Sequence, residues 1–149
     1  MASAEQTPPA RSLADELRRW PDALLAALLR DRPDLATPVP HDSPQLASRA
    51  ASRSSLARAL DGLERLQLFT LDALRVAGHA TPEELLAWVN APRAQVEEAL
   101  TRALDLALAW PAPGGLRALS GIGEVLRGGP EVGVSGLWRG TVCSAPRRR

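Results

Sequence analysis

Residues 78–93 read Gly-His-Ala-Thr-Pro-Glu-Glu-Leu-Leu-Ala-Trp-Val-Asn-Ala-Pro-Arg, and this stretch decides the fold. Thr81 is predicted to be a helix N-cap, Pro82 suits the first helical position, and Glu84 completes a capping box. The Asn-Ala pair then interrupts the short apolar pattern, and Pro92 opens a second helix. Two helices joined by so short a break predict a helix-turn-helix.

The segment before it, from Leu63 to Ala77, predicts a helix with a broad apolar face. Its charged residues and Gln67 fall within less than half of the circumference at about 100° per residue. Apart from Thr70, the rest is apolar and includes Leu63, Leu66, Phe69, Leu71, Leu74 and Val76. We expect a central helix that packs on two sides, with the preceding helices covering its second side. Gly78 supplies its C-terminal stop.

The segment after the helix-turn-helix predicts a short β-hairpin. The last helix is expected to bury Val96, Leu100, Ala103, Leu104 and Ala107. Two apolar runs, 107–110 and 116–119, then flank a Pro/Gly-rich loop at 111–115. The alternative is that the helix simply continues to Trp110, because Ala and Leu are poor strand formers. The fold class predicted from these elements is mainly α, with a winged-helix-like unit (helix-turn-helix plus short β-hairpin) from about residue 60 to 119.

In front of this unit, residues 12–60 predict a helical module. Ser12 is placed to cap a first short helix with an apolar stripe formed by Leu13, Leu17 and Trp20. Pro21 fits the first turn of a second helix. The expected buried face of that helix consists of Leu24, Leu25, Leu28 and Leu29.

Segment 32–42 contains three prolines and is predicted to be an extended connection. A helix is expected to follow near Ser43, with Pro44 in its first turn. One more helix is then expected, capped by Ser52, Ser54 or Ser55.

Both ends of the chain are expected to be disordered. Residues 1–11 are small, polar and Pro-containing, and the Gly- and Arg-rich ending lacks apolar periodicity. A short helix is expected around Ile122 to Arg127. The predicted organisation is therefore a leader (1–11), a helical module (12–60), a winged-helix-like unit with a trailing short helix (61–128) and a tail (129–149).

Composition excludes several kinds of chemistry. The 149-residue chain has no Lys and no Tyr, so a Schiff-base lysine, a P-loop lysine and a tyrosine acid are all excluded. Cys143 is the only cysteine, and neither His41 nor His79 has a second ligand at metal spacing. We therefore expect no enzymatic activity, no cofactor, no metal and no small-molecule substrate.

No segment resembles a membrane span or a signal peptide. The longest apolar run, residues 23–29, is far too short to cross a bilayer. The first residues lack the apolar core of a secretory signal. We expect a cytoplasmic protein with no membrane partner.

Charge weighs against the DNA-binding role that a helix-turn-helix suggests. The candidate nucleic-acid contacts are Arg93, Thr101 and Arg102 on the second helix and Arg117 on the hairpin. Residues 61–120, however, contain five Arg against eight Asp and Glu. Because phosphate neutralisation supplies most non-specific affinity, strong autonomous binding of duplex DNA is not expected.

Docking to another protein is the alternative role. A weakly charged surface suits that use, and the net charge of the whole chain is only +1. Trp20, Trp88, Trp110 and Trp138 would be anchors if they were exposed. Core or half-core packing is the favoured interpretation for the first three.

The text of the chain also resembles a known family. Residues 12–30, Ser-Leu-Ala-Asp-Glu-Leu-Arg-Arg-Trp-Pro-Asp-Ala-Leu-Leu-Ala-Ala-Leu-Leu-Arg, together with 32–40 and 60–66, resemble the N-terminal region of actinobacterial helicase-associated proteins. Those proteins have an XPB-like helicase domain further along a longer chain. The likeness covers roughly residues 12–128, and the ending from about Gly129 departs from it.

The resemblance implies a non-catalytic module of a helicase-associated, DNA-linked protein, truncated or frameshifted before the helicase region. No helicase motif is present, so no catalytic residue is carried over. The DNA just downstream is expected to encode more of the family's sequence in another frame. A protein–protein docking domain without nucleic-acid contact remains the alternative function.

Overall fold

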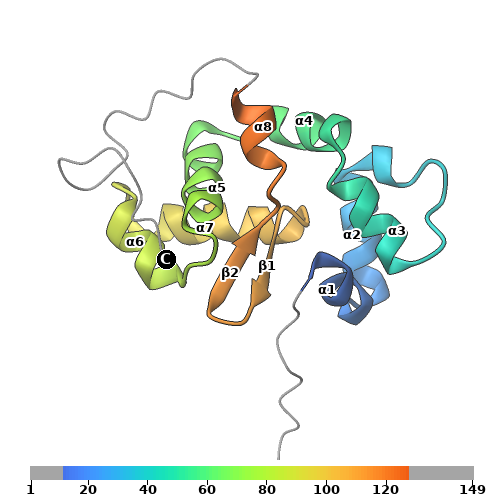
Figure 1. Cartoon of the computed structure of the whole chain (residues 1–149), viewed down its shortest axis with the longest axis horizontal. Helices are drawn as coiled ribbons and strands as arrows, with labels where there is room; N and C mark the ends of the chain where they lie inside the picture. Colours follow the sequence, from blue (N-terminus) through green and yellow to red (C-terminus); the bar gives the residue numbers. More distant parts are fainter. Residues whose placement is uncertain (1–11, 128–149) are drawn as a thin grey trace, which may run out of the picture.

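The computed structural model describes residues 12–127. Within them the chain is mainly helical, with one two-stranded antiparallel sheet (Figure 1). The elements are α1 (Leu13–Arg19), α2 (Asp22–Asp31), the 3₁₀ turn η1 (Pro33–Leu35), α3 (Ser43–Ala50), α4 (Arg53–Asp61), α5 (Arg65–Ala77), α6 (Pro82–Trp88), α7 (Arg93–Asp105), β1 (Ala109–Ala112), β2 (Gly115–Ala118) and α8 (Ile122–Arg127). The leader and tail predictions lie outside the described residues.

Local stop and start signals set the boundaries of α5 and α6, as predicted. Gly78 ends α5 with a φ of +82°, a left-handed conformation that favours glycine. The Thr81 hydroxyl accepts a hydrogen bond of 3.2 Å from the Glu84 backbone N–H at the start of α6. The expected start of α5 at Leu63 is two residues early, because Glu64 and Gln67 form a capping box that begins the helix at Arg65.

The hairpin exists, but β1 begins two residues later than the expected run 107–110, and β2 begins one residue earlier than the expected run 116–119. Ala109 pairs with Ala118 and Ala112 with Gly115, so the loop contains only two residues, Pro113 and Gly114. Gly114 has a φ of +88°, and Pro followed by such a Gly is typical of a type II turn. The prediction of a loop at 111–115 was therefore wrong. Pro111 is part of a strand, which a two-stranded sheet tolerates because each strand is an edge.

A third segment joins this hairpin. Ala80, between α5 and α6, forms an antiparallel bridge with Leu116 of β2 through N–H···O distances of 3.1 and 2.7 Å. Gly115 permits the approach, because a Cβ on it would lie 2.5 Å from the Ala80 carbonyl oxygen. The start of α6 is thereby tied to the hairpin.

The core forms around α5, which packs against α6, α7, α8 and β2. Phe69, Leu71 and Leu74 are buried, as predicted, but Val76 is 38% exposed. The expectation that the preceding helices cover the second side of α5 was wrong, because a following helix covers it. The trailing helix α8 packs there, and α4 packs in turn on α8 (Figure 1).

The N-terminal helices pack at the other end of the molecule (Figure 1). α1 lies against α3 and β1, and α2 contacts α7. Leu13 and Leu17 are buried as expected. In α2, however, only Leu28 of the four leucines is buried, Leu25 and Leu29 are half-buried, and Leu24 is 47% exposed. The predicted buried face was too wide, because α7 and η1 cover only part of this helix.

The proline-rich connection was also only partly as predicted. Its start folds into the η1 turn, where Leu35 and Arg32 are buried rather than extended in solvent. Asp42, through its side chain, caps α3, which begins at Ser43 with Pro44 in its first turn. Ser52 occupies the N-cap position of α4, one of the three predicted positions, but its hydroxyl donates to the Arg49 carbonyl and does not cap the helix.

Candidate functional site

Arg93, the first residue of α7 and a candidate nucleic-acid contact, is paired with carboxylates of the protein itself. Arg93 Nη1 lies 3.0 Å from Glu83 Oε1 on α6 and 3.3 Å from Glu97 Oε1 one turn along α7. The hydrogen bond between Arg93 and Glu83 lowers the pKa of Glu83 and raises the pKa of Arg93. The cation closest to the start of α7 is thus paired within the unit.

The other candidate contacts do not form one surface. Thr101 donates its hydroxyl hydrogen bond back to the Glu97 carbonyl. Arg102 Nη1 donates to Asp31 Oδ2 of α2 at 2.9 Å, so it faces the N-terminal helices. Arg117 is exposed on β2, and among residues 12–127 it has no ion pair. Of the four candidates, the structure brings only Arg93 and Thr101 near the same residue, Glu97.

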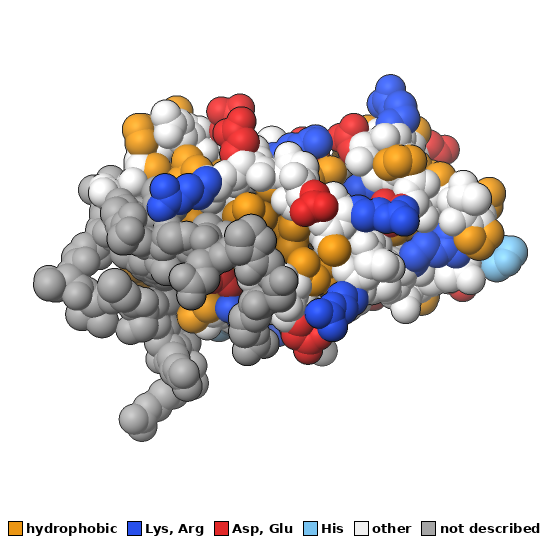
Figure 2. Space-filling model, turned by 90° about the horizontal axis from the view of Figure 1, so that it is seen from above, with side chains coloured by type: hydrophobic (Ala, Val, Ile, Leu, Met, Phe, Trp, Pro, Cys, Tyr) orange, Lys and Arg blue, Asp and Glu red, His pale blue; other side chains and the backbone are white. Residues whose placement is uncertain are grey.

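Charge is mixed on the face of the molecule that Figure 2 shows. On the face in Figure 2, basic and acidic side chains are interspersed, and neither sign forms a continuous area. Such a pattern does not match the basic stripe that phosphate binding requires. Within residues 12–127, no three His, Cys, Asp or Glu side chains are grouped as a metal site would need. None of the described helices has the length and apolarity to cross a membrane.

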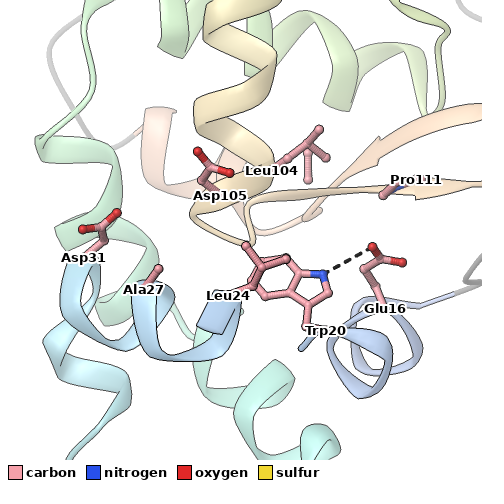
Figure 3. Close-up of a pocket in the computed structure, with 9 residues that line it drawn as sticks. Glu16, Trp20, Leu24, Ala27, Asp31, Leu104, Asp105 and Pro111 are labelled. Carbon is pink, nitrogen blue, oxygen red and sulfur yellow. Dashed lines mark hydrogen bonds between the residues drawn. The ribbon is translucent and has the colours of Figure 1, made fainter. Parts of the chain in front are cut away.

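A groove of about 350 Å³ lies between the N-terminal helices and the start of the hairpin (Figure 3). One wall comes from the end of α1 and from α2, and the other from the end of α7 and from β1. Its lining residues are Glu16, Trp20, Leu24, Ala27, Asp31, Leu104, Asp105, Ala109 and Pro111. The volume is near the lower end of roughly 300–1,000 Å³ for ligand pockets.

The groove combines an apolar floor with acidic ends. The half-buried Trp20 ring lies beside Leu24, and its Nε1 donates a hydrogen bond of 3.3 Å to Glu16 Oε1 (Figure 3). Glu16 and Asp31 lie toward opposite ends, and Asp105 stands on the α7 wall (Figure 3). No basic residue lines the groove.

Beside this groove, a buried arginine at the end of α2 links that helix to α3, to α4 and to the end of α7. Arg32 is 1% exposed, and its guanidinium donates to the Leu106 carbonyl at 3.0 Å and the Ala50 carbonyl at 2.9 Å. A third bond of 2.6 Å goes to Ser55 Oγ, which itself donates to Asp34. Burial lowers the pKa of Arg32, while the nearby Asp34 carboxylate acts in the opposite direction. The network holds the two walls of the groove together.

Sequence reasoning missed both the groove and this network. The groove joins residues 16–31 with 104–111, and no local pattern pairs those segments. One signal was present: α2 carries more leucine than a single packed face can cover. The interpretation of the tryptophans is confirmed, because Trp110 is buried and Trp20 and Trp88 are half-buried, while Trp138 lies outside the described residues.

Comparison with known proteins assigns no relative. No protein-family model matches the chain, and no curated protein or solved structure matches it either.

Proposed function

We propose that the chain is a non-catalytic docking module for another protein, built on a winged-helix unit at residues 60–119. The observation that carries the proposal is the groove between α2 and the α7–β1 junction, with Leu24 47% exposed on its wall. Together, the concave surface and the exposed aliphatic side chain on its wall offer apolar area that a partner can remove from water.

The order of elements supports the winged-helix part of this proposal. Helix α5, the bridge at Ala80, helices α6 and α7, and the β1–β2 hairpin follow one another as in such units. The isolated bridge at Ala80 takes the position that the short first strand has in such units, and we assign the hairpin as the wing. A rigid unit of this kind presents a fixed surface to a partner.

The ion pairs of α7 disfavour duplex DNA as that partner. Arg93 and Arg102 are engaged with Glu83, Glu97 and Asp31, so phosphate contact would first require these pairs to break. The exposed carboxylates left on the same helix would then face the phosphates.

A DNA-linked role of the helicase-associated kind is the second candidate. It is favoured by the element order and by Arg117, which is exposed on the hairpin where a wing contacts DNA. The resemblance to the N-terminal region of helicase-associated proteins agrees with this role.

A salt titration separates the two candidates. Fluorescence anisotropy with a labelled 20-base-pair duplex should give no saturable binding of the full chain at low salt, because the α7 arginines are paired. Micromolar binding with a steep salt slope, weakened by Arg117→Ala and Arg93→Ala but not by Arg30→Ala, would support DNA and overturn docking.

Partner capture provides the positive arm. The immobilised full chain should retain a protein from a cell extract after nuclease treatment and a wash at high salt, since apolar contacts survive both. If every retained protein is released by nuclease, the docking proposal fails and the nucleic-acid candidate replaces it.

A further inference from the structure

We propose that the groove between α2 and the α7–β1 junction binds a peptide segment that presents a large apolar side chain next to arginine. This inference rests on the proposed docking function and names the chemistry of its partner. It is carried by the shape of the groove, by its exposed apolar surface and by the sign of its charge.

The floor of the groove is suited to one or two large side chains. Leu24, Ala27 and Leu104 provide aliphatic surface, the Trp20 ring lies across it, and Pro111 closes the hairpin side (Figure 3). A volume of about 350 Å³ is sufficient for one or two large side chains of a peptide. Burial of a Leu or Phe side chain there removes Leu24 from water as well.

The charges of the groove select a basic neighbour for that side chain. All three charged lining residues, Glu16, Asp31 and Asp105, are acidic. Arg102 pairs with Asp31, and the Trp20 indole binds Glu16, so both are partly satisfied. Asp105 is exposed and has no ion pair or side-chain hydrogen bond among residues 12–127. It is the carboxylate available to a partner.

Arginine fits this carboxylate better than lysine does. Its guanidinium donates two parallel hydrogen bonds to a carboxylate and stacks on an aromatic face such as that of Trp20. The same carboxylates repel a phosphate backbone or an anionic lipid headgroup, which argues against nucleic acid or a membrane at this position.

Binding of synthetic peptides tests the inference. The probes are acetyl-Gly-Ser-Leu-Phe-Arg-Arg-Ser-Gly-amide and the same peptide with Glu replacing both Arg, titrated into the full chain by isothermal calorimetry. We expect saturable binding of the Arg peptide and at least tenfold weaker binding of the Glu peptide. Failure of the Arg peptide to bind, or equal binding of both peptides, overturns the inference.

Matched variants locate the binding. Leu24→Glu and Asp105→Asn should each weaken the Arg peptide at least fivefold. Val76→Glu, an exposed apolar residue on α5, and Glu98→Gln, an exposed carboxylate elsewhere on α7, should leave binding unchanged. Equal thermal midpoints exclude unfolding as the cause. Weakening by the control variants as well places the contact elsewhere and overturns the inference.

Two further outcomes distinguish the inference from the proposed function. If nuclease-resistant capture of a partner survives both groove variants, docking stands and this groove is not its site. If sedimentation shows a dimer of the chain that Leu24→Glu dissociates, a second copy occupies the groove, and the peptide assignment is overturned.

Discussion

Each end of α7 meets an arginine, and the two arginines stand in opposite surroundings. At the C-terminal end, Arg32 is 1% exposed and its guanidinium is held by the Leu106 and Ala50 carbonyls and the Ser55 hydroxyl. At the N-terminal end, the Arg93 side chain is 60% exposed and faces the carboxylates of Glu83 and Glu97.

Burial, rather than the number of hydrogen bonds, decides what each arginine does for the fold. Removing Arg32 leaves buried carbonyl oxygens without a donor, whereas every partner of Arg93 can turn to water. The exposed pairs are screened and gain little over hydration. The C-terminal end of α7 is therefore needed for the fold, whereas the ion pairs at its N-terminal end can be lost with little effect on stability.

The largest effect is expected from Arg32→Ala. Loss of the guanidinium orphans two buried carbonyls and leaves a cavity, so the free energy of unfolding should fall by about 3–5 kcal/mol, measured by urea denaturation. Arg30→Ala, at an exposed position of α2, is the control and should stay within about 0.5 kcal/mol. An equal effect of the two substitutions would contradict a structural role for the buried Arg32 guanidinium.

Ser55→Ala should have an intermediate effect. Ser55 is 3% exposed, accepts from Arg32 and donates to Asp34, so removal of its hydroxyl deprives the buried Arg32 and the half-buried Asp34 of one partner each. A loss of about 1–3 kcal/mol is expected from the same denaturation experiment. The neighbouring Ser54→Ala is exposed and should change little. If Ser55→Ala leaves the free energy of unfolding unchanged, the stability of the Arg32 network does not depend on the Ser55 hydroxyl.

Thr81→Ala tests whether the cap of α6 stabilises the region around the N-terminal end of α7 more than the exposed ion pairs do. Thr81 caps α6, which carries Glu83, and loss of the cap should cost about 1 kcal/mol. Thr101→Ala removes a hydroxyl that bonds only one turn back within α7 and should cost less. The reverse order would contradict a role for the cap.

The smallest effect is expected from Arg93→Ala, and it depends on pH. Arg93 lowers the pKa of Glu83 below its ordinary value of 4.5 in the folded state. The stabilisation is therefore complete above pH 4.5 and is lost as the pH falls through the lowered pKa of Glu83. The difference in Tm between wild type and Arg93→Ala should be small at neutral pH and vanish in acid. A difference that grows on acidification would contradict this sign.

The fold was predictable where a few neighbouring residues determine the structure. Thr81, Pro82 and Glu84 specify the start of α6, and Gly78 specifies the end of α5, because caps and left-handed residues act within one turn. The hairpin was predicted but shifted, since Ala and Leu have little strand preference and only the Pro113–Gly114 turn sets the register.

The site was less predictable, because it depends on segments far apart in sequence. The charge balance of residues 61–120 already argued against a DNA surface, and the ion pairs of Arg93 and Arg102 agree with it. The amino-acid sequence did not indicate which arginine is buried. Arg32 lies in a proline-rich segment, and its acceptors belong to residues 50, 55 and 106.

The separation of 74 residues between Arg32 and Leu106 also has a consequence for synthesis on the ribosome. Helices α2, α3 and α4 emerge first, at a time when one acceptor of their central guanidinium has not yet been made. Burying a guanidinium with one of its three acceptors missing is unfavourable, so we expect these helices to pack stably only after α7 has been made. We therefore expect a nascent chain that ends before residue 106 to keep apolar surface exposed, which is the surface that chaperones bind.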